Sequence, residues 1–362
     1  MRQDHKLLLV APSLKLGGIE RALTNLSYEF VEQGLETSYI SCLKAEHFYT
    51  VPKEVNLLEP SFRRQGGIFN KILFYPRLLW FIRKSVRQIN PKAVLVYGDW
   101  FSPITLLALS GLKIPVYISD RTIPDYPFKF PIPQLKKWLY PKSAGFIAQT
   151  TRAKNYKEKI FGNSLNIRVI PNALPLLNNT SASMANDELS LLYMGRFAWE
   201  KDPEILIRAL PRILKVYPEI KLRMAGDGPL LTVMKQLVQN LELESSVVFL
   251  GKVTDVSHSY YNCSVFVLPS VIEGFPNALI EAMSFGLPVV CFSDIPFEDI
   301  VTNGIDGVVV QERSSEALAN EIIRLIGSEE LRNNLGRRAI LSVERFDLKN
   351  IASQTLNFIE LQ

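Results

Sequence analysis

Short runs of apolar residues recur along the chain and are separated by amphipathic stretches. The first run, KLLLVAP at residues 6–12, does not alternate apolar with polar positions, which is typical of a parallel strand buried on both faces. A Gly-Gly pair and a helical apolar repeat up to residue 34 follow it, so a loop and a helix are predicted there. Further strands are predicted at residues 37–43, 93–97, 115–119, 145–150 and 167–172. Strands that alternate with helices predict a parallel sheet covered by helices on both faces.

The same alternation restarts after a stretch of small and polar residues at 173–188, which is typical of a linker. Strands are predicted there at residues 189–195, 220–226, 246–251, 265–269, 288–292 and 307–310. We therefore predict two Rossmann-like, doubly wound α/β domains, at residues 1–173 and 187–342. A helical segment at 343–362 follows and could lie over either domain. Because such sheets bind ligands beyond the carboxyl ends of their strands, the expected site is a cleft between the two domains.

With 362 residues, the chain is longer than one hydrophobic core usually supports, so two domains are expected. Its 47% of hydrophobic residues is typical of a folded globular protein. No apolar run approaches the roughly 18 to 20 residues that span a bilayer. The first apolar run is also too short for a secretory signal, so a cytoplasmic location is expected. Cys42, Cys263 and Cys291 lie in apolar surroundings without metal-type spacing, which favours a reducing compartment and no metal site.

Charge is distributed unevenly. Residues 1–180 carry 25 Lys and Arg against 12 Asp and Glu, whereas residues 181–362 carry 16 against 24. The basic excess gathers at residues 62–92 and 127–142, where aromatic side chains are interleaved with the cations. Such a mixture is attracted to anionic membrane surfaces, so we expect contact with the inner face of the cell membrane. A groove for single-stranded nucleic acid would use the same residue types, and a helix with a solvated basic face is the third interpretation; we expect no nucleic-acid partner.

The phosphate-binding motifs of dehydrogenases and P-loop enzymes are absent from the sequence. Instead, Arg196 and Lys201 lie five positions apart in the loop that follows the strand at 189–195. Arg as a fork and Lys as a point charge would suit a diphosphate. An ordinary loop with two cations is the alternative.

The segment EGFPNALIEA at residues 273–282 carries two glutamates around a Phe-Pro-Asn turn. Glu273 is predicted in the loop beyond a strand, Pro276 at the first position of a helix, and Glu281 within that helix. The early backbone N–H groups would then be free to bind phosphate, and they belong to Asn277, Ala278 and Leu279. Glu281 would accept hydrogen bonds from a ribose diol, and Glu273 would hold hydroxyl groups of a sugar. A surface helix with solvated glutamates is the alternative.

Gly17 and Gly18 separate the first strand from its helix. Without side chains, their N–H groups would approach the phosphates of the same ligand from the other domain. A plain tight turn would have the same sequence.

Several of these segments occur in the order seen in a known family. The chain resembles the GT-B glycosyltransferases of the large retaining family 4 at GGIER (17–21), VIPNAL (169–174), MGRFAWEKDPEILIRAL (194–210), MAGDGP (224–229) and LPSVIEGFPNALIEAMSFGLPVV (268–290). The resemblance implies that Arg196 and Lys201 neutralise the leaving diphosphate, that Glu281 binds ribose and that Glu273 contacts the donor sugar. It also implies that Gly17 and Gly18 close over the phosphates, and that no divalent metal or other cofactor takes part.

Two segments depart from the family pattern. Many relatives carry a histidine near the sugar, where this chain has Asp120 and Arg121 within YISDRTIPD. We expect Asp120 to orient the acceptor or the sugar and Arg121 to meet phosphate, with a structural salt bridge as the alternative. Residues 293–300, SDIPFEDI, replace a glycine pair before an acid, which leaves the donor-sugar contacts there open.

The sequence thus predicts a membrane-associated, retaining glycosyltransferase. It would move a hexose or N-acetylhexosamine from a nucleotide diphosphate sugar, with UDP as the expected nucleotide, to a lipid-linked or polysaccharide acceptor. The alternatives are a nucleotide-sugar epimerase of the same fold and a non-catalytic protein that binds a nucleotide sugar.

Overall fold

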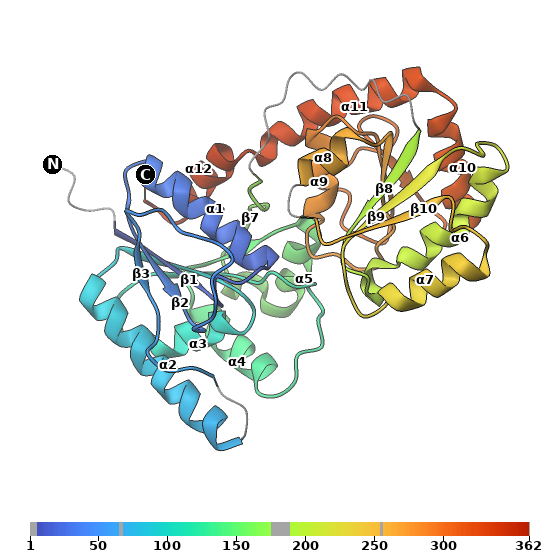
Figure 1. Cartoon of the computed structure of the whole chain (residues 1–362). Helices are drawn as coiled ribbons and strands as arrows, with labels where there is room; N and C mark the ends of the chain where they lie inside the picture. Colours follow the sequence, from blue (N-terminus) through green and yellow to red (C-terminus); the bar gives the residue numbers. More distant parts are fainter. Residues whose placement is uncertain (1–5, 65–67, 175–188, 254–255, 362) are drawn as a thin grey trace. The chain divides into compact units, whose positions relative to one another are not determined.

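The chain folds into two compact units, each built on a parallel sheet (Figure 1). The computed structural model describes residues 6–64, 68–174, 189–253 and 256–361. Unit 1 comprises Met1–Pro175 and Phe346–Gln362, and unit 2 comprises Leu176–Arg345. Residues 175–188 of the predicted linker lie outside the described residues.

The sheet of unit 1 has the strand order β3-β2-β1-β4-β5-β6-β7, and its pairings are parallel. The strands are β1 (Lys6–Ala11), β2 (Glu36–Ser41), β3 (Asn56–Leu58), β4 (Ala93–Tyr97), β5 (Val116–Ser119), β6 (Gly145–Ala148) and β7 (Ile167–Val169). Six of these match the predicted strands, and β3 was missed. This strand has only three residues and is exposed or half-buried, so it lacks the apolar run that marks the others.

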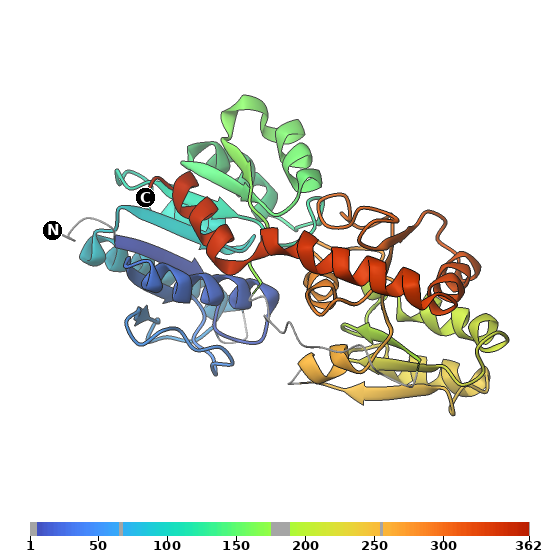
Figure 2. The same cartoon turned by 90° about the horizontal axis from the view of Figure 1, so that it is seen from above.

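Helices cover both faces of this sheet because alternate residues of the central strands point to opposite sides. Leu7 and Leu9 of β1 pack in one core with α1 (Gly18–Glu32) and α12 (Leu348–Phe358), which lie side by side over the sheet (Figure 2). Leu8 and Val10 pack on the other side in a core with α2 (Ile68–Ile89) and α3 (Phe101–Ala108). The remaining elements of unit 1 are α4 (Ile132–Leu139), η1 (Tyr140–Lys142), α5 (Thr151–Phe161) and η2 (Gly162–Ser164).

The C-terminal segment belongs to unit 1. An isolated parallel bridge joins Leu174 to Asp347, and the Asp347 side chain then caps α12 by accepting from the backbone N–H of Lys349 at 3.0 Å. α12 buries Ile351, Ala352 and Leu356 in the core that contains α1. The helical segment whose location the sequence left open therefore packs on the N-terminal sheet.

The sheet of unit 2 has the order β10-β9-β8-β11-β12-β13 and is parallel as well. Its strands match the six predicted ones: β8 (Ser190–Met194), β9 (Lys221–Ala225), β10 (Val247–Gly251), β11 (Val265–Leu268), β12 (Val289–Phe292) and β13 (Val308–Val310). One face packs in a core with α6 (Pro203–Leu214), α7 (Leu231–Asn240) and α10 (Ser315–Ile326). α9 (Asn277–Ser284) contacts β11, β12 and α11 (Glu329–Val343). The other elements are η3 (Trp199–Lys201), α8 (Val256–Tyr261) and η4 (Glu344–Phe346).

Two doubly wound parallel-sheet units confirm the predicted α/β fold class. In both units the loops that follow the strands at their carboxyl ends carry most of the residues singled out from the sequence.

Candidate functional site

Arg196 lies in a loop whose backbone is fixed by a neighbouring glycine turn. The N–H groups of Gly195 and Phe197 donate to Ala225 O and Asp227 O, both at 3.0 Å. Gly226 and Gly228 make this approach possible, because a Cβ on either would lie 1.9 Å or 2.5 Å from a carbonyl oxygen of the loop, and both have a positive φ. The Arg196 side chain is 63% exposed and pairs with Glu200. Its backbone is thus held while its guanidinium faces solvent.

Lys201 and Glu273 meet although 72 residues separate them in sequence. Lys201 Nζ lies 2.6 Å from Glu273 Oε1, and Ser270 Oγ donates to the same oxygen at 2.9 Å. The backbone joins the two loops as well, since Glu200 O accepts from the N–H groups of Val271 and Ile272 at 3.0 and 3.2 Å. The loops beyond β8 and β11 therefore form one braced structure that carries a cation and a carboxylate.

Arg313 braces the same loops and was not among the residues predicted from the sequence. It follows β13, and its Nη1 and Nη2 donate to Pro269 O at 3.0 Å and Ser270 O at 2.7 Å. It also pairs with Asp202 at 2.9 Å and with Asp294 at 2.5 Å. Asp294 lies in the 293–300 segment that departs from the family pattern, so at least one acid of that segment has a structural partner. The partners of the Arg313 guanidinium lie far from it in sequence, so no sequence motif marks this arginine. The fold alone brings these groups together.

Glu281 lies on α9 and contacts a tyrosine of α8. Tyr260 OH donates to Glu281 Oε2 at 3.1 Å, and Ala278 O lies 3.4 Å from the same hydroxyl. The ring of Tyr260 is fully buried against Phe285, with the ring centroids 5.0 Å apart. The packed tyrosine thus restricts the position of the Glu281 carboxylate.

The expected start of α9 needs correction. Pro276 is not the first helical residue but the N-cap, with φ −82° and ψ 75°, so its carbonyl accepts from the N–H of Leu279 at 3.0 Å. The N–H of Asn277 donates to Phe275 O at 3.0 Å. Two of the three N–H groups expected to be free, those of Asn277 and Leu279, therefore bond within the chain, and phosphate binding by the N–H of Ala278 stays a prediction.

Gly17 and Gly18 lie in unit 1, where Gly17 is the N-cap of α1. Gly17 has an extended backbone, φ −177°, which any residue can adopt. Its lack of a side chain matters for space instead, since a Cβ would lie 2.3 Å from Glu20 Oε2. Glu20 also accepts from Ser13 Oγ at 3.0 Å. A carboxylate thus lies over the loop where a phosphate was predicted, and it would have to turn away before an anion binds there.

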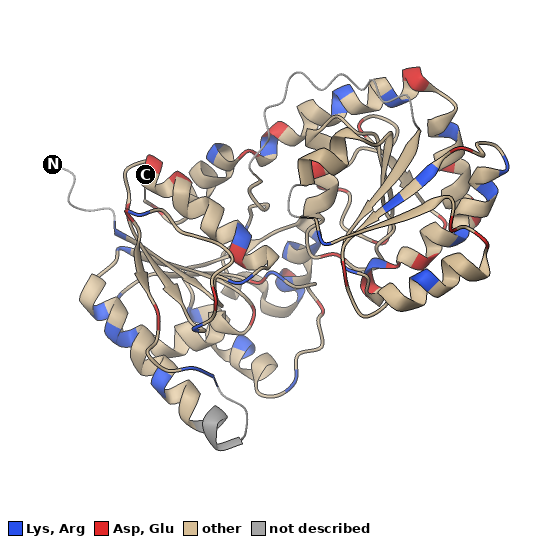
Figure 3. Ribbon diagram, viewed as in Figure 1, with Lys and Arg blue, Asp and Glu red and all other residues tan. Residues whose placement is uncertain are grey.

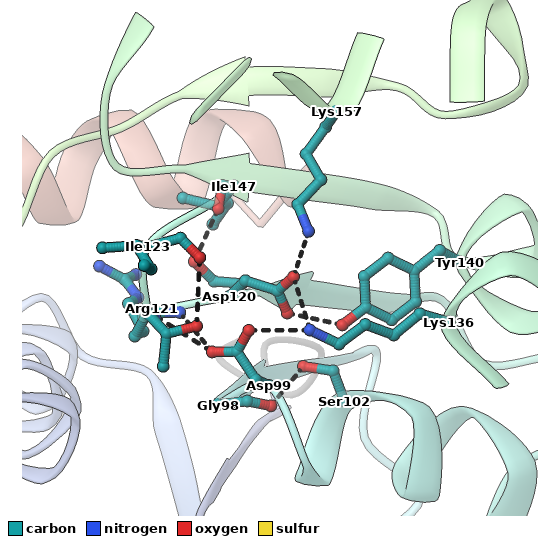
Figure 4. A network of polar contacts seen from close by, with 12 residues as sticks. Gly98, Asp99, Ser102, Asp120, Arg121, Ile123, Lys136, Tyr140, Ile147 and Lys157 are labelled. Carbon is teal, nitrogen blue, oxygen red and sulfur yellow. Dashed lines mark hydrogen bonds and ion pairs between the residues drawn. The ribbon is translucent and has the colours of Figure 1, made fainter. Parts of the chain in front are cut away.

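Asp120 follows β5 and is the centre of a buried ion-pair network in unit 1 (Figure 4). Its Oδ2 accepts from Lys157 at 2.5 Å and from Lys136 at 3.0 Å, and its Oδ1 accepts from Tyr140 OH at 2.6 Å. Burial alone would raise the pKa of Asp120, but Lys157 and then Lys136 outweigh it and lower the pKa to about 2. These contacts favour the salt-bridge alternative, and the orienting role stays a prediction.

Among the residues that the structure describes, no group of three or more His, Cys, Asp or Glu side chains is placed to hold a metal ion. No helix in the described parts of the chain is long and apolar enough to cross a membrane.

Both halves of the chain match models of known protein families. Residues 16–176 match the family model described as Glycosyltransferase Family 4, and residues 180–341 match that of Glycosyl transferases group 1. A Campylobacter jejuni protein is 25% identical over 98% of both chains and is named GalNAc-alpha-(1->4)-GalNAc-alpha-(1->3)-diNAcBac-PP-undecaprenol alpha-1,4-N-acetyl-D-galactosaminyltransferase. The amylovoran biosynthesis glycosyltransferase AmsD of Erwinia amylovora is 25% identical over 92% of this chain and 94% of its own. Among solved structures, Anabaena HepE in complex with UDP superposes with a TM-score of 0.83 at 19% identity, over 99% of this chain and 100% of that one.

Proposed function

The chain belongs to the GT-B glycosyltransferases of family 4 and is itself a glycosyltransferase, and from this premise we propose its donor, acceptor and stereochemistry. It transfers a hexose or N-acetylhexosamine from a UDP-sugar, with retention, to a lipid-linked or polysaccharide acceptor at the cytoplasmic face of the membrane. The relative named for an undecaprenol-linked acceptor and the UDP complex of HepE support the two substrate classes.

The braced pair of Lys201 and Glu273 is the observation that carries this proposal. Lys201 and Arg196 supply positive charge for the diphosphate as it leaves, and Glu281 accepts from the ribose hydroxyls. Lys201 and Ser270 both bind Oε1 of Glu273, so we assign Oε2 to the hydroxyls of the donor sugar. Fixed charges of this kind stabilise a departing diphosphate and an oxocarbenium-like sugar without reorganising.

In this reaction the bond from the anomeric carbon to the diphosphate oxygen breaks, and the bond to the acceptor hydroxyl oxygen forms on the same face of the sugar. The acceptor proton passes to the leaving diphosphate. Glu273 is committed to Lys201 and the sugar, and Glu281 to ribose, so neither carboxylate is needed as a covalent nucleophile, unlike the carboxylate pair of retaining hydrolases.

A screen of nucleotide sugars tests the proposal directly. We expect UDP release from a UDP-hexose or UDP-N-acetylhexosamine only when a polyprenyl diphosphate-linked or polysaccharide acceptor is present. Lys201→Ala should weaken UDP binding measured by calorimetry, whereas Lys215→Ala, at an exposed site of the same unit, should not. Conversion of the donor without any acceptor would indicate an epimerase instead, and UDP binding without turnover would indicate a binding protein.

A basic surface on α2 supports the proposed membrane contact. Figure 3 shows Lys and Arg along this helix and no acid. Leu73 and Trp80 are exposed between the cations, at 53% and 61%. Beside the helix, a pocket of about 380 Å³ is lined by Lys44, Arg63 and Arg77 together with Ser61, Phe62, Leu73 and Phe74. Exposed apolar side chains among unopposed cations suit the interface of an anionic bilayer.

Not every cation of this helix is available to a membrane. Arg83 Nη1 donates to Ala108 O at 2.7 Å and to Ser110 O at 2.9 Å, so Arg83 secures the end of α3. We therefore expect the charge reversal of Arg77, Lys84 and Arg87 to Glu, with Arg83 retained, to abolish binding to anionic vesicles while UDP affinity is unchanged. Reversal of three exposed lysines elsewhere, Lys53, Lys159 and Lys215, is the matched control. Equal vesicle binding by both triple variants would contradict the assignment to α2.

A further inference from the structure

The carboxyl edge of the unit 1 sheet holds three cations and two carboxylates, of which four are buried and Arg121 is half-buried. Lys136, Lys157 and Arg121 are the cations, and Asp99 and Asp120 are the carboxylates (Figure 4). Asp99 follows β4, Asp120 and Arg121 follow β5, and the lysines come from α4 and α5. The cluster therefore has one more positive than negative charge.

The oxygens of both carboxylates already have donors. Asp99 Oδ1 accepts from Lys136 at 2.8 Å, and its Oδ2 accepts from the backbone N–H groups of Arg121 and Thr122 at 2.9 and 3.1 Å. Asp120 binds both lysines and Tyr140. The excess charge therefore belongs to Arg121, whose side chain forms no ion pair with either carboxylate among the described residues.

The Arg121 guanidinium is held on one edge and on one face. Its Nη1 donates to Asn172 Oδ1, which also accepts from Gln149 Nε2 at 2.8 Å. Its central carbon lies 3.6 Å from the centroid of the Tyr97 ring. These contacts fix the plane of the guanidinium. They do not involve its opposite edge, which consists of Nε and Nη2.

That opposite edge has no partner. Nε and Nη2 of Arg121 are both buried, and in the part of the chain that the structure describes neither has a hydrogen-bond acceptor. Burial lowers the pKa of Arg121 against the opposing effects of Tyr97, Asp99 and Asp120. A buried donor without an acceptor costs free energy, and more when it is charged. Such a group in a native protein calls for an explanation, and a bound ion or a catalytic role is one.

We propose that the Nε and Nη2 edge of Arg121 binds an oxyanion of the substrate. These two N–H groups point to the same side and match the two oxygens of a phosphate or a carboxylate. The position at the carboxyl ends of β5 and β7 is where sheets of this kind bind ligands. Because Nε and Nη2 are closed to solvent, the side chains around them have to move before an oxyanion reaches this edge.

Two sources can supply this oxyanion, given the proposed function on which the inference rests. One is the phosphate of a lipid-linked acceptor, and the other is the carboxylate of an acidic sugar. Both oxyanions would bind the same two N–H groups of Arg121. The relative affinities for a phosphate and a carboxylate therefore distinguish the two sources.

Anion binding by the full-length protein with saturating UDP tests the proposal, because UDP keeps the donor site occupied. Calorimetry with inorganic diphosphate, methyl phosphate and glucuronate should detect binding of at least one anion to the wild type. Arg121→Met should weaken it roughly ten- to hundredfold, the range expected for charged hydrogen bonds. Arg121→Lys keeps the charge but lacks the fork, so it should show an intermediate loss and serves if the Met variant fails to fold. Arg168→Met, at an exposed site on β7, should bind as the wild type does.

Tighter binding of the phosphates would assign the acceptor phosphate as the source, and tighter binding of glucuronate would assign the acidic sugar. The proposal is overturned if the UDP-saturated wild type binds none of the three anions, or if the Arg121 variants bind them as well as the wild type does. Because UDP binding is measured first on the same sample, a protein that fails to bind UDP would refute the proposed function instead.

Discussion

Replacing Asp120 by asparagine distinguishes an orienting role from a structural one. The substitution keeps the shape of the side chain and one oxygen acceptor but removes the charge that Lys136 and Lys157 share. Lys136 retains Asp99 at 2.8 Å, whereas in the described residues Asp120 is the acid paired with Lys157. Lys157 has a side chain that is 7% exposed, so it would be left as a buried charge without a counterion.

The magnitude follows from this burial. Removing one partner of a buried ion pair costs about 3–5 kcal/mol. Because one of the two lysines keeps a second carboxylate, we expect the lower end, a loss of about 3 kcal/mol in the free energy of unfolding of unit 1. Urea unfolding followed by circular dichroism measures this loss. UDP binding, which we assign to unit 2, should be unchanged.

Asp125→Asn is the matched control, since Asp125 is exposed and lies in the segment that follows Asp120. We expect its unfolding curve to superimpose on that of the wild type. If Asp120→Asn instead unfolds within about 0.5 kcal/mol of the wild type, as surface substitutions do, while glycosyl transfer is abolished, the structural interpretation is wrong. Asp120 would then act on the substrate.

Three further predictions concern the same charges and their counterparts in unit 2. Since the folded pKa of Asp120 is lowered to about 2, its contribution to stability is complete above about pH 4 and is lost as the pH falls from there to about 2. This contribution of Asp120 to the free energy of unfolding amounts to roughly 2 kcal/mol. The Asp120→Asn variant should not show this loss of stability between about pH 4 and about pH 2. Glu281→Gln should weaken UDP binding roughly tenfold through the ribose contact, whereas Glu244→Gln at an exposed site should not; equal affinities would remove ribose binding from Glu281. Arg313→Lys loses the two guanidinium donors that bind the carbonyl oxygens of residues 269 and 270. The free energy of unfolding of unit 2 should therefore fall by about 1–3 kcal/mol. Turnover should fall more than UDP affinity does, and unchanged turnover would show that the brace does not position the site.

Most of the fold could be predicted because parallel strands buried on both faces are continuous apolar runs. β1, β4 and β11 are buried along nearly all of their length, and each was recognised as KLLLVAP, AVLVY or VFVLP. The half-exposed β3 has no such run and was missed. The packing of α12 was left open for a related reason, since an amphipathic helix shows that it has an apolar face but not which sheet that face covers.

The candidate site could be predicted only where a charged residue of a recognisable motif directly follows a predicted strand. Lys201 and Glu273 each follow a strand of one sheet, so the parallel topology alone favours their meeting. Arg313 follows a strand as well, but it belongs to no motif. Two of its acceptors are backbone carbonyl oxygens, which every residue has, so the sequence does not mark them. Pro276 was misplaced by one position because proline is common both at the first helical position and near the cap, and the sequence does not report its ψ angle.

The two strand-end carboxylates show why residue type and spacing do not determine a role. Asp120 and Glu273 both pair with lysine, and both side chains are less than 10% exposed. Asp120 has donors on both oxygens, which come from three side chains of α4, η1 and α5. Its capacity as an acceptor is used to hold those elements together. The two side-chain donors to Glu273 converge on Oε1, and Lys201 is 25% exposed, so a substrate can approach the pair without dismantling a buried network. The role of each acid thus depends on how many of its lone pairs the protein itself occupies, which is a property of packing.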